Sequence, residues 1–285
     1  MPSAARPGWA RGLTAATDSR VARMAAGKTG KSNWARGLTA ATSESIARNA
    51  ALRRGRARGS YPTRVASRVA RRLYPNGHVE WTQQLAYAVG LIATDGCLSG
   101  KTITFTNTDR DLVKTFVECV GHSVKIGVQH KFGRQPAYRA QMGNRTLFDW
   151  LVAIGITPRK SLTIGAISVP DTYFLAVVRG LLDGDGSVRN YWYTVPKGTR
   201  PYQALAVLFH SASRPHLEWL QHELTRQHGF RGALFRKGQR PHDVHALKYS
   251  TKEARRLLPL LYPPGVPCLQ RKLLIWEAYR GRECG

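Results

Sequence analysis

The pattern of apolar and polar positions predicts a folded region that begins near residue 81. Apolar residues recur at helical spacing in 109–121 and 144–155. Apolar and polar residues alternate, as in half-buried strands, in 101–107, 123–130 and 137–143. With the apolar run 88–96 as a first helix, the predicted order is helix, two strands, helix, two strands, helix.

A similar order recurs in the second half of the chain. Helical patterns occupy 174–186, 214–229 and 252–263. Strand-like segments lie between them, in 204–211, 231–237 and 244–250. We therefore expect an α+β fold built from two copies of one unit, residues 81–165 and residues 166–285.

The first 80 residues lack this pattern. They hold 16 Lys and Arg against three acids, with few large apolar residues, so they cannot bury a core alone. The motif WARGLTAAT occurs at 9–17 and again at 34–42. We expect residues 1–60 to be a basic, poorly globular tail with two small nucleic-acid clamps, and residues 61–80 to be a linker. A duplicated tail without defined contacts is the alternative.

The stretch 25–32 resembles the end of a P-loop without its structural context. Ala25 replaces the first glycine, and no apolar strand precedes the loop. Nucleotide binding is therefore not expected there.

The charge of the chain narrows the choice of partner. There are 44 Lys and Arg against 17 Asp and Glu, a formal net charge of +27, which favours a polyanion such as nucleic acid. A solvated basic surface and an anionic membrane surface are the alternatives. No apolar run is long enough to span a bilayer, and no secretion signal is found, so we expect a cytoplasmic or nucleoid-associated protein without a membrane partner. The four cysteines form no CxxC pair, which argues against a zinc knuckle or a disulfide framework.

A paired motif carries the candidate chemistry. AVGLIATDG, residues 88–96, corresponds to VRGLLDGDG, residues 178–186. Glycine inside a helix costs about 1 kcal/mol relative to alanine, so Gly90 and Gly180 indicate close helix–helix packing. Such packing would bring Asp95 and Asp185 together at two helix C-termini. Asp183 corresponds to Ala93, so it is not expected to be essential.

Two carboxylates at the negative ends of two helices repel each other unless cations lie between them. Mg²⁺ suits such a pair, with Mn²⁺ as an alternative, because it takes few carboxylates together with water and phosphate oxygens. In a basic protein this combination suggests phosphodiester hydrolysis. An EF-hand lacks its required Gly and Glu here, and an ordinary Asp-Gly turn does not explain two matching copies.

The two motifs resemble the LAGLIDADG signature of homing endonucleases, in the single-chain form with two motifs. The resemblance covers residues 81–285 and implies two pseudo-symmetric αββαββα repeats whose signature helices form the interface. It implies saddle-shaped antiparallel sheets in the DNA major groove, and cleavage of both strands across the minor groove that leaves 3′ overhangs. Asp95 and Asp185 would bind the metal, whereas a backbone ligand at position 94, which is Thr94, stays undefined. The N-terminal copies of WARGLTAAT resemble nuclease-associated modular repeats.

The resemblance implies four further site residues. Lys160 and Lys272 match a basic residue that follows the third helix of each repeat and reaches the active site. A structural or phosphate-contacting lysine is the alternative for each. Asn107 and Ser211 match a polar residue after the second strand that positions water.

Strand side chains that face the groove would read the bases. The candidates in the first repeat are Lys101, Thr102, Thr104, Thr106, Lys125, Gln129, Lys131, Arg139 and Gln141. Those in the second are Arg189, Tyr191, Tyr193, Arg236, Lys237, His245 and Lys248. A register slip of one residue would invert either set. Because the repeats differ, we expect a monomer that recognises a long double-stranded target that is not fully palindromic.

Two other functions use the same scaffold. A non-cleaving DNA-binding regulator and an RNA maturase are alternatives to the endonuclease, and loss of a signature acid would favour them. A self-splicing intein would need a terminal nucleophile and a His-Asn end, neither of which this chain offers.

Overall fold

The computed structural model describes residues 77–130, 135–194, 201–239 and 243–281. All of them belong to one compact unit, Arg64–Gly285. The expected basic tail, its two WARGLTAAT repeats, the stretch 25–32 and the linker up to residue 76 lie outside the described residues. Within the described part, no helix is both long and apolar enough to cross a membrane.

The first repeat has the expected order of elements. They are α4 (Gln83–Asp95), β1 (Gly96–Ser99), β2 (Thr102–Asn107), α5 (Arg110–Val120), β3 (Gly127–Gln129), β4 (Ala137–Gly143) and α6 (Arg145–Ala153). A short 3₁₀ helix, η2 (Lys160–Leu162), follows α6. Strand β3 is shorter than the alternating segment 123–130, because 123–126 do not pair with a neighbouring strand.

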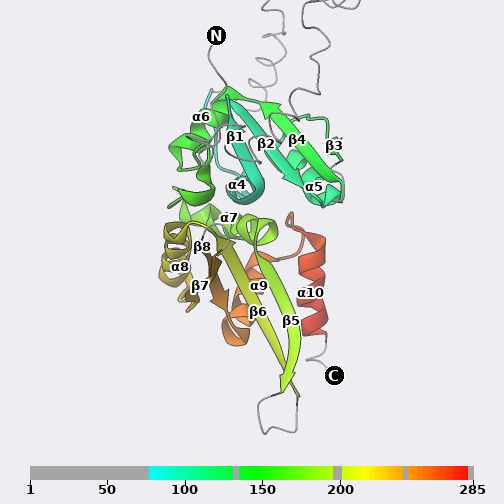
Figure 1. The fold of residues 1–285 in the computed structure, drawn as a ribbon, viewed down its shortest axis with the longest axis vertical. Helices are drawn as coiled ribbons and strands as arrows, with labels where there is room; N and C mark the ends of the chain where they lie inside the picture. Colours follow the sequence, from blue (N-terminus) through cyan, green and yellow to red (C-terminus); the bar gives the residue numbers. More distant parts are fainter. Residues whose placement is uncertain (1–76, 131–134, 195–200, 240–242, 282–285) are drawn as a thin grey trace, which may run out of the picture. The chain divides into compact units, whose positions relative to one another are not determined.

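The second repeat has the same order and one additional helix. Its elements are α7 (Asp171–Gly184), β5 (Ser187–Thr194), β6 (Pro201–Ser211), α8 (Arg214–His228), β7 (Ala233–Gln239), β8 (Asp243–Tyr249) and α9 (Thr251–Leu261). Helix α10 (Gln270–Arg280) follows, has no counterpart in the first repeat, and lies beside β5 (Figure 1). The sequence pattern did not indicate α10, because its apolar residues 273–276 are consecutive and show no helical period.

Each repeat forms one antiparallel sheet, and the two sheets have equivalent strand orders. The first is β1-β2-β4-β3 and the second is β5-β6-β8-β7. In both repeats the helix that follows the second strand ends at a left-handed glycine, Gly121 with φ 66° and Gly229 with φ 68°. These matches confirm the predicted α+β fold of two αββαββα repeats.

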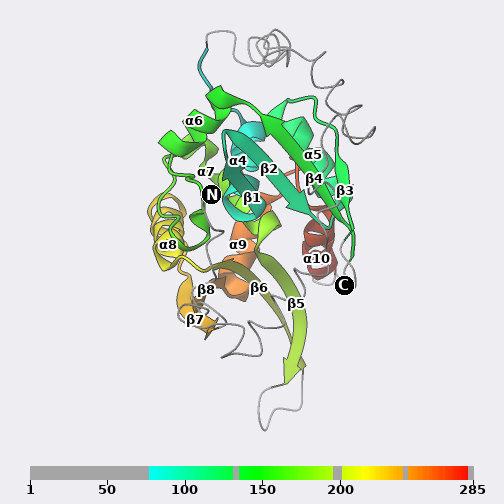
Figure 2. The same ribbon diagram turned by 45° about the horizontal axis from the view of Figure 1, so that its top comes forward.

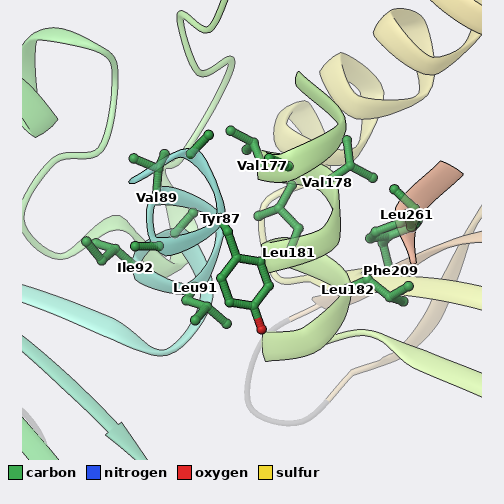
Figure 3. Close-up of a cluster of buried hydrophobic side chains, with 14 of the residues drawn as sticks. Tyr87, Val89, Leu91, Ile92, Val177, Val178, Leu181, Leu182, Phe209 and Leu261 are labelled. Carbon is green, nitrogen blue, oxygen red and sulfur yellow. The ribbon is translucent and has the colours of Figure 1, made fainter. Parts of the chain in front are cut away.

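The signature helices α4 and α7 lie side by side and join the repeats (Figures 1 and 2). A Cβ atom on Gly90 would lie 2.8 Å from the Cα of Gly180, and one on Gly180 would lie 2.9 Å from the Cα of Gly90. Around this contact the helices bury Tyr87 and Leu91 from one side and Leu181 from the other (Figure 3). The close approach predicted from the two glycines is therefore present.

Candidate active site

Asp95 and Asp185 occupy equivalent ends of the two packed helices. Asp95 is the last residue of α4, and Asp185 caps the C-terminus of α7. Loss of hydration, and after it the neighbouring Asp95 charge, raise the pKa of Asp185 to about 6. Loss of hydration also raises the pKa of Asp95. The two carboxylates therefore lie close enough for their charges to repel each other. Part of the Asp185 residue remains exposed to solvent.

Asn107 fixes the orientation of the first carboxylate. Its Nδ2 donates to Asp95 Oδ2 at 2.8 Å. Its Oδ1 accepts from the backbone N–H of Asp109 at 2.9 Å, so the amide group is held at both ends. The hydrogen bond from Asn107 Nδ2 lowers the pKa of Asp95 and opposes the effect of desolvation. The structure thus places the Asn107 side chain beside Asp95.

Ser211 occupies the corresponding position in the second repeat but makes a different contact. Its Oγ accepts from the backbone N–H of Ser213 at 3.0 Å, the equivalent of the turn after Asn107. Among the described residues, no hydrogen bond joins Ser211 to Asp185. Instead both line one small pocket of about 160 Å³. The two halves of the site are therefore unequal, because serine is shorter than asparagine.

Two buried lysines bind the C-terminal ends of the signature helices. Lys160 Nζ donates to the carbonyl oxygens of Gly96 and, at 3.5 Å, Thr94. Lys272 Nζ donates to three carbonyl oxygens, those of Leu182 at 2.5 Å, Asp183 at 2.9 Å and Gly186 at 2.7 Å. An ammonium group has three N–H donors, so Lys272 uses all of them on the backbone.

These lysines explain how acids are tolerated at the negative end of each helix. A cation there is favourable, and it satisfies carbonyl groups that have no partner within the helix. Both lysine charges lower the pKa of Asp95 and that of Asp185. Burial in turn lowers the pKa of Lys272 to about 8 and lowers that of Lys160. The centre is thus a compact group of two acids and two bases.

Asp183 has a role that the sequence did not indicate. It is fully buried, and it accepts from Tyr87 Oη at 2.9 Å, Tyr262 Oη at 2.6 Å and the backbone N–H of Leu269 at 2.7 Å. The buried Arg179 lies nearby, over the Tyr87 ring at 5.4 Å. The carboxylate thus anchors the start of α10, three residues before Lys272. An acid within an apolar run was the available signal, since a buried charge requires partners.

Two histidines near Asp185 were also missed. The pocket shared with Ser211 is lined by His210 and His216 as well, and His216 Nδ1 lies 2.8 Å from the carbonyl oxygen of Gly165. Desolvation lowers the pKa of His210 to about 4, with nearby cations adding to the effect. Nothing in the spacing of the nine histidines indicated this site.

The first sheet presents most of its predicted DNA contacts on one face. Thr104 is opposite Gln141, and Thr106 is opposite Arg139. Thr102 and Gln129 share this face by the register, whereas Ile103 and Phe105 point into the core. Lys101 is exposed in the turn between β1 and β2, and Lys125 is exposed before β3. Lys131 lies outside the described residues.

The second sheet divides its predicted contacts between two faces. By register, the open face, away from the core, carries Arg189, Tyr191, Tyr193 and Lys248, with Lys237 at a β-bulge beside it. Arg236 and His245 are opposite each other on the other face. His245 is buried there, and Arg236 pairs with Asp243 at 2.9 Å. Residues 236 and 237 are consecutive on β7, and residues 245 and 248 are three apart on β8, so simple alternation already separates each pair and the predicted set could not lie on one face.

No protein-family model matches the chain. No curated protein matches it either. Among solved structures, the homing endonuclease I-WcaI bound to its DNA recognition sequence is 13% identical, with a TM-score of 0.50 over 77% of this chain and 95% of that chain. I-DmoI in complex with DNA and Mn is 15% identical, with a TM-score of 0.44 over 65% of this chain and 98% of that chain.

Full-length DUF199/WhiA from Thermatoga maritima is a third similar structure. It is 14% identical, with a TM-score of 0.45 over 72% of this chain and 63% of that chain. The likeness to I-WcaI, together with the duplicated topology, shows that the chain has the two-repeat LAGLIDADG fold.

Proposed function

We propose that this chain is a site-specific endonuclease of double-stranded DNA that hydrolyses phosphodiester bonds with the help of divalent metal ions. The observation that carries the proposal is the meeting of Asp95 and Asp185 between two buried lysines. The raised pKa of each acid indicates a site in which negative charge is poorly compensated in the protein alone. Structural ion pairs usually have the opposite effect on a carboxylate.

The donor atoms suit Mg²⁺, with Mn²⁺ as an alternative. The described residues contain no group of three or more His, Cys, Asp and Glu placed to hold a metal ion. Asp95 and Asp185 would therefore supply two carboxylates, with water and DNA phosphate oxygens as the remaining ligands, which is the usual environment of Mg²⁺. A bound ion would stabilise negative charge on the phosphate and make water a stronger nucleophile.

The residues of the chain then have distinct tasks. Asn107 holds Asp95 in one orientation, and Lys160 and Lys272 fix the two helix ends that carry the acids. Both ammonium groups add positive charge beside the reacting phosphate without leaving their backbone partners. The pocket lined by Asp185 and Ser211 has room for a few water molecules next to the acid.

The open faces of the two sheets would contact the duplex. The net charge of +27 favours association with a polyanion, and the similar I-WcaI is bound to its DNA recognition sequence. Under this proposal the chain acts as a monomer on a long target that is not fully palindromic. Both strands are cut across the minor groove, and 3′ overhangs remain.

Cleavage of a randomised duplex library, with sequencing of the ends, tests the proposal. We expect cuts within a shared recognition sequence in Mg²⁺, and none in EDTA or with the Asp95→Asn, Asp185→Asn double variant. Asp149→Asn is the matched control, because this exposed acid only pairs with Arg145 on the same helix. Specific, salt-sensitive binding without cuts would contradict nuclease activity and favour a regulator or an RNA maturase on this scaffold.

A further inference from the structure

The open faces of the two sheets have different chemistry. The open face of the first sheet carries hydroxyl, amide and guanidinium groups, from Thr102, Thr104, Thr106, Gln129, Arg139 and Gln141. On the second sheet, the equivalent central strand β6 carries Ala206 and Leu208 where β2 carries Thr102 and Thr104, and His210 where β2 carries Thr106. A duplicated fold would not by itself produce this difference, since both faces stand in the same relation to the core.

The apolar part of the second face is a broad pocket of about 760 Å³. Leu208 and Ala206 form its floor, and Tyr191 and Phe235 border it from β5 and β7. Tyr191 and Phe235 are each 41% exposed, so much of their ring surface is open to solvent. Exposed apolar patches of this kind usually mark a binding surface.

Helix α10 makes the pocket specific to the second repeat. Its residues Ile275 and Ala278 line the pocket, and the first repeat has no corresponding helix. Further along β5, Tyr193 lies on the same face and packs between Tyr191 and Tyr202, with ring centroids 6.3 and 6.0 Å apart. The apolar surface therefore continues from α10 along this strand.

Cations surround the apolar surface. Arg189, Lys237 and Lys248 line the pocket, and none of the described residues that line it is acidic. An occupant should therefore be an anion that presents apolar groups between its charges. The major groove of DNA has this combination, because phosphates flank base edges and only thymine projects a methyl group among the four bases.

We propose that the second sheet recognises its half of the DNA target through the C5-methyl groups of thymine, whereas the first sheet relies on hydrogen bonds to base edges. This inference rests on the proposed function, since it assumes that both faces contact one duplex. Tyr191, Phe235 and the floor of the pocket bury the methyl groups. The flanking cations hold the phosphates on either side.

Replacement of thymine by uracil tests the inference, because it removes the methyl group and leaves the hydrogen-bonding edge unchanged. Binding to the selected target would be measured in EDTA, with thymines replaced in one half-site at a time. We expect about a fourfold loss of affinity for each contacted thymine in one half-site, as for burial of one methyl group, and little change in the other.

Variants assign this effect to the second sheet. Tyr191→Ser and Phe235→Ser should each reduce the discrimination between thymine and uracil in the sensitive half-site. Trp192→Ser is the matched control, because Trp192 neighbours Tyr191, is 54% exposed, and points to the opposite face. It should retain the full discrimination.

Different outcomes separate this inference from the proposed function. A specific target whose half-sites respond equally to uracil, or whose more sensitive half-site keeps its full discrimination with Tyr191→Ser and Phe235→Ser, would overturn the methyl readout and leave the nuclease standing. Failure to select any specific sequence would overturn both. Unchanged DNA binding by Tyr191→Ser and Phe235→Ser, with a change in oligomeric state, would assign the patch to a second copy of the chain and overturn the inference.

Discussion

Gly90 and Gly180 contact each other through their main chains, with no side chain between the helices that carry them. Gly90→Ala would place a methyl group against the Cα of Gly180 and the carbonyl oxygen of Val177. Although alanine normally favours a helix, we expect a loss of about 2–4 kcal/mol in the free energy of unfolding, because the helices must separate. Urea unfolding checks this. Gly165→Ala, where an added Cβ meets nothing within 4 Å, should change stability little.

Replacement of Lys272 should lower the free energy of unfolding, apart from any effect on chemistry. Lys272→Met would leave three carbonyl oxygens at the end of α7 without their donor. We expect a loss of about 3 kcal/mol, since each lost partner in a buried site costs about 1 kcal/mol or more. Chemical denaturation measures this loss. Lys114→Met, in an exposed ion pair with Asp111, should cost much less.

The buried tyrosines Tyr262 and Tyr249 should respond differently to loss of the hydroxyl. Tyr262→Phe removes a donor to the buried Asp183 and should cost about 2 kcal/mol, as for a hydrogen bond to a charged group. Tyr249→Phe removes a buried hydroxyl that has no partner among the described residues, so it should be neutral or stabilising. Thermal unfolding of both variants compares them directly. Equal losses would contradict the role assigned to Asp183.

The acid at position 185 should make the metal-free protein less stable as pH rises. Its pKa is raised to about 6 in the folded state, so the folded chain holds a proton that the unfolded chain releases near pH 4. Stability should therefore fall between about pH 4 and pH 6 and stay lower above that range. Asp185→Asn should remove this dependence and gain about 1 kcal/mol at pH 8, a value that allows for solvent screening. Unfolding in EDTA at pH 5 and pH 8 measures the difference.

Asn107 and Ser211 should contribute unequally to cleavage. Asn107→Ala frees the carboxylate of Asp95 and should slow one strand cut by about tenfold to a hundredfold, as expected for a lost positioning contact. Ser211→Ala leaves Asp185 with its existing contacts and should have a smaller effect. Cleavage of supercoiled plasmid carrying the target would show nicked circles with Asn107→Ala. Equal rates for the two variants would contradict the asymmetry.

Much of the fold follows from local patterns. The strand and helix periods predicted most elements of both repeats, though not β1, β5 or α10, and the paired glycines predicted the contact between the signature helices. The pairing of Arg236 with Asp243 did not follow, because it depends on the register between β7 and β8, which the sequence pattern of either strand alone does not give. The role of Asp183 did not follow either, since its partners Tyr87 and Leu269 are 96 and 86 residues away. Such contacts depend on the tertiary arrangement rather than on spacing.

The position of Lys272 also sets when the centre can form during synthesis. Asp183 gains Tyr262 and Leu269, and the end of α7 gains Lys272, only after residues 262–272 have left the ribosome. At typical elongation rates, roughly 10 to 35 seconds separate the emergence of Asp95 from that of Lys272. A nascent chain therefore carries both acids before Lys272 is available to bind the end of α7. Assembly of the two acids with both lysines is thus delayed until residue 272 has been translated.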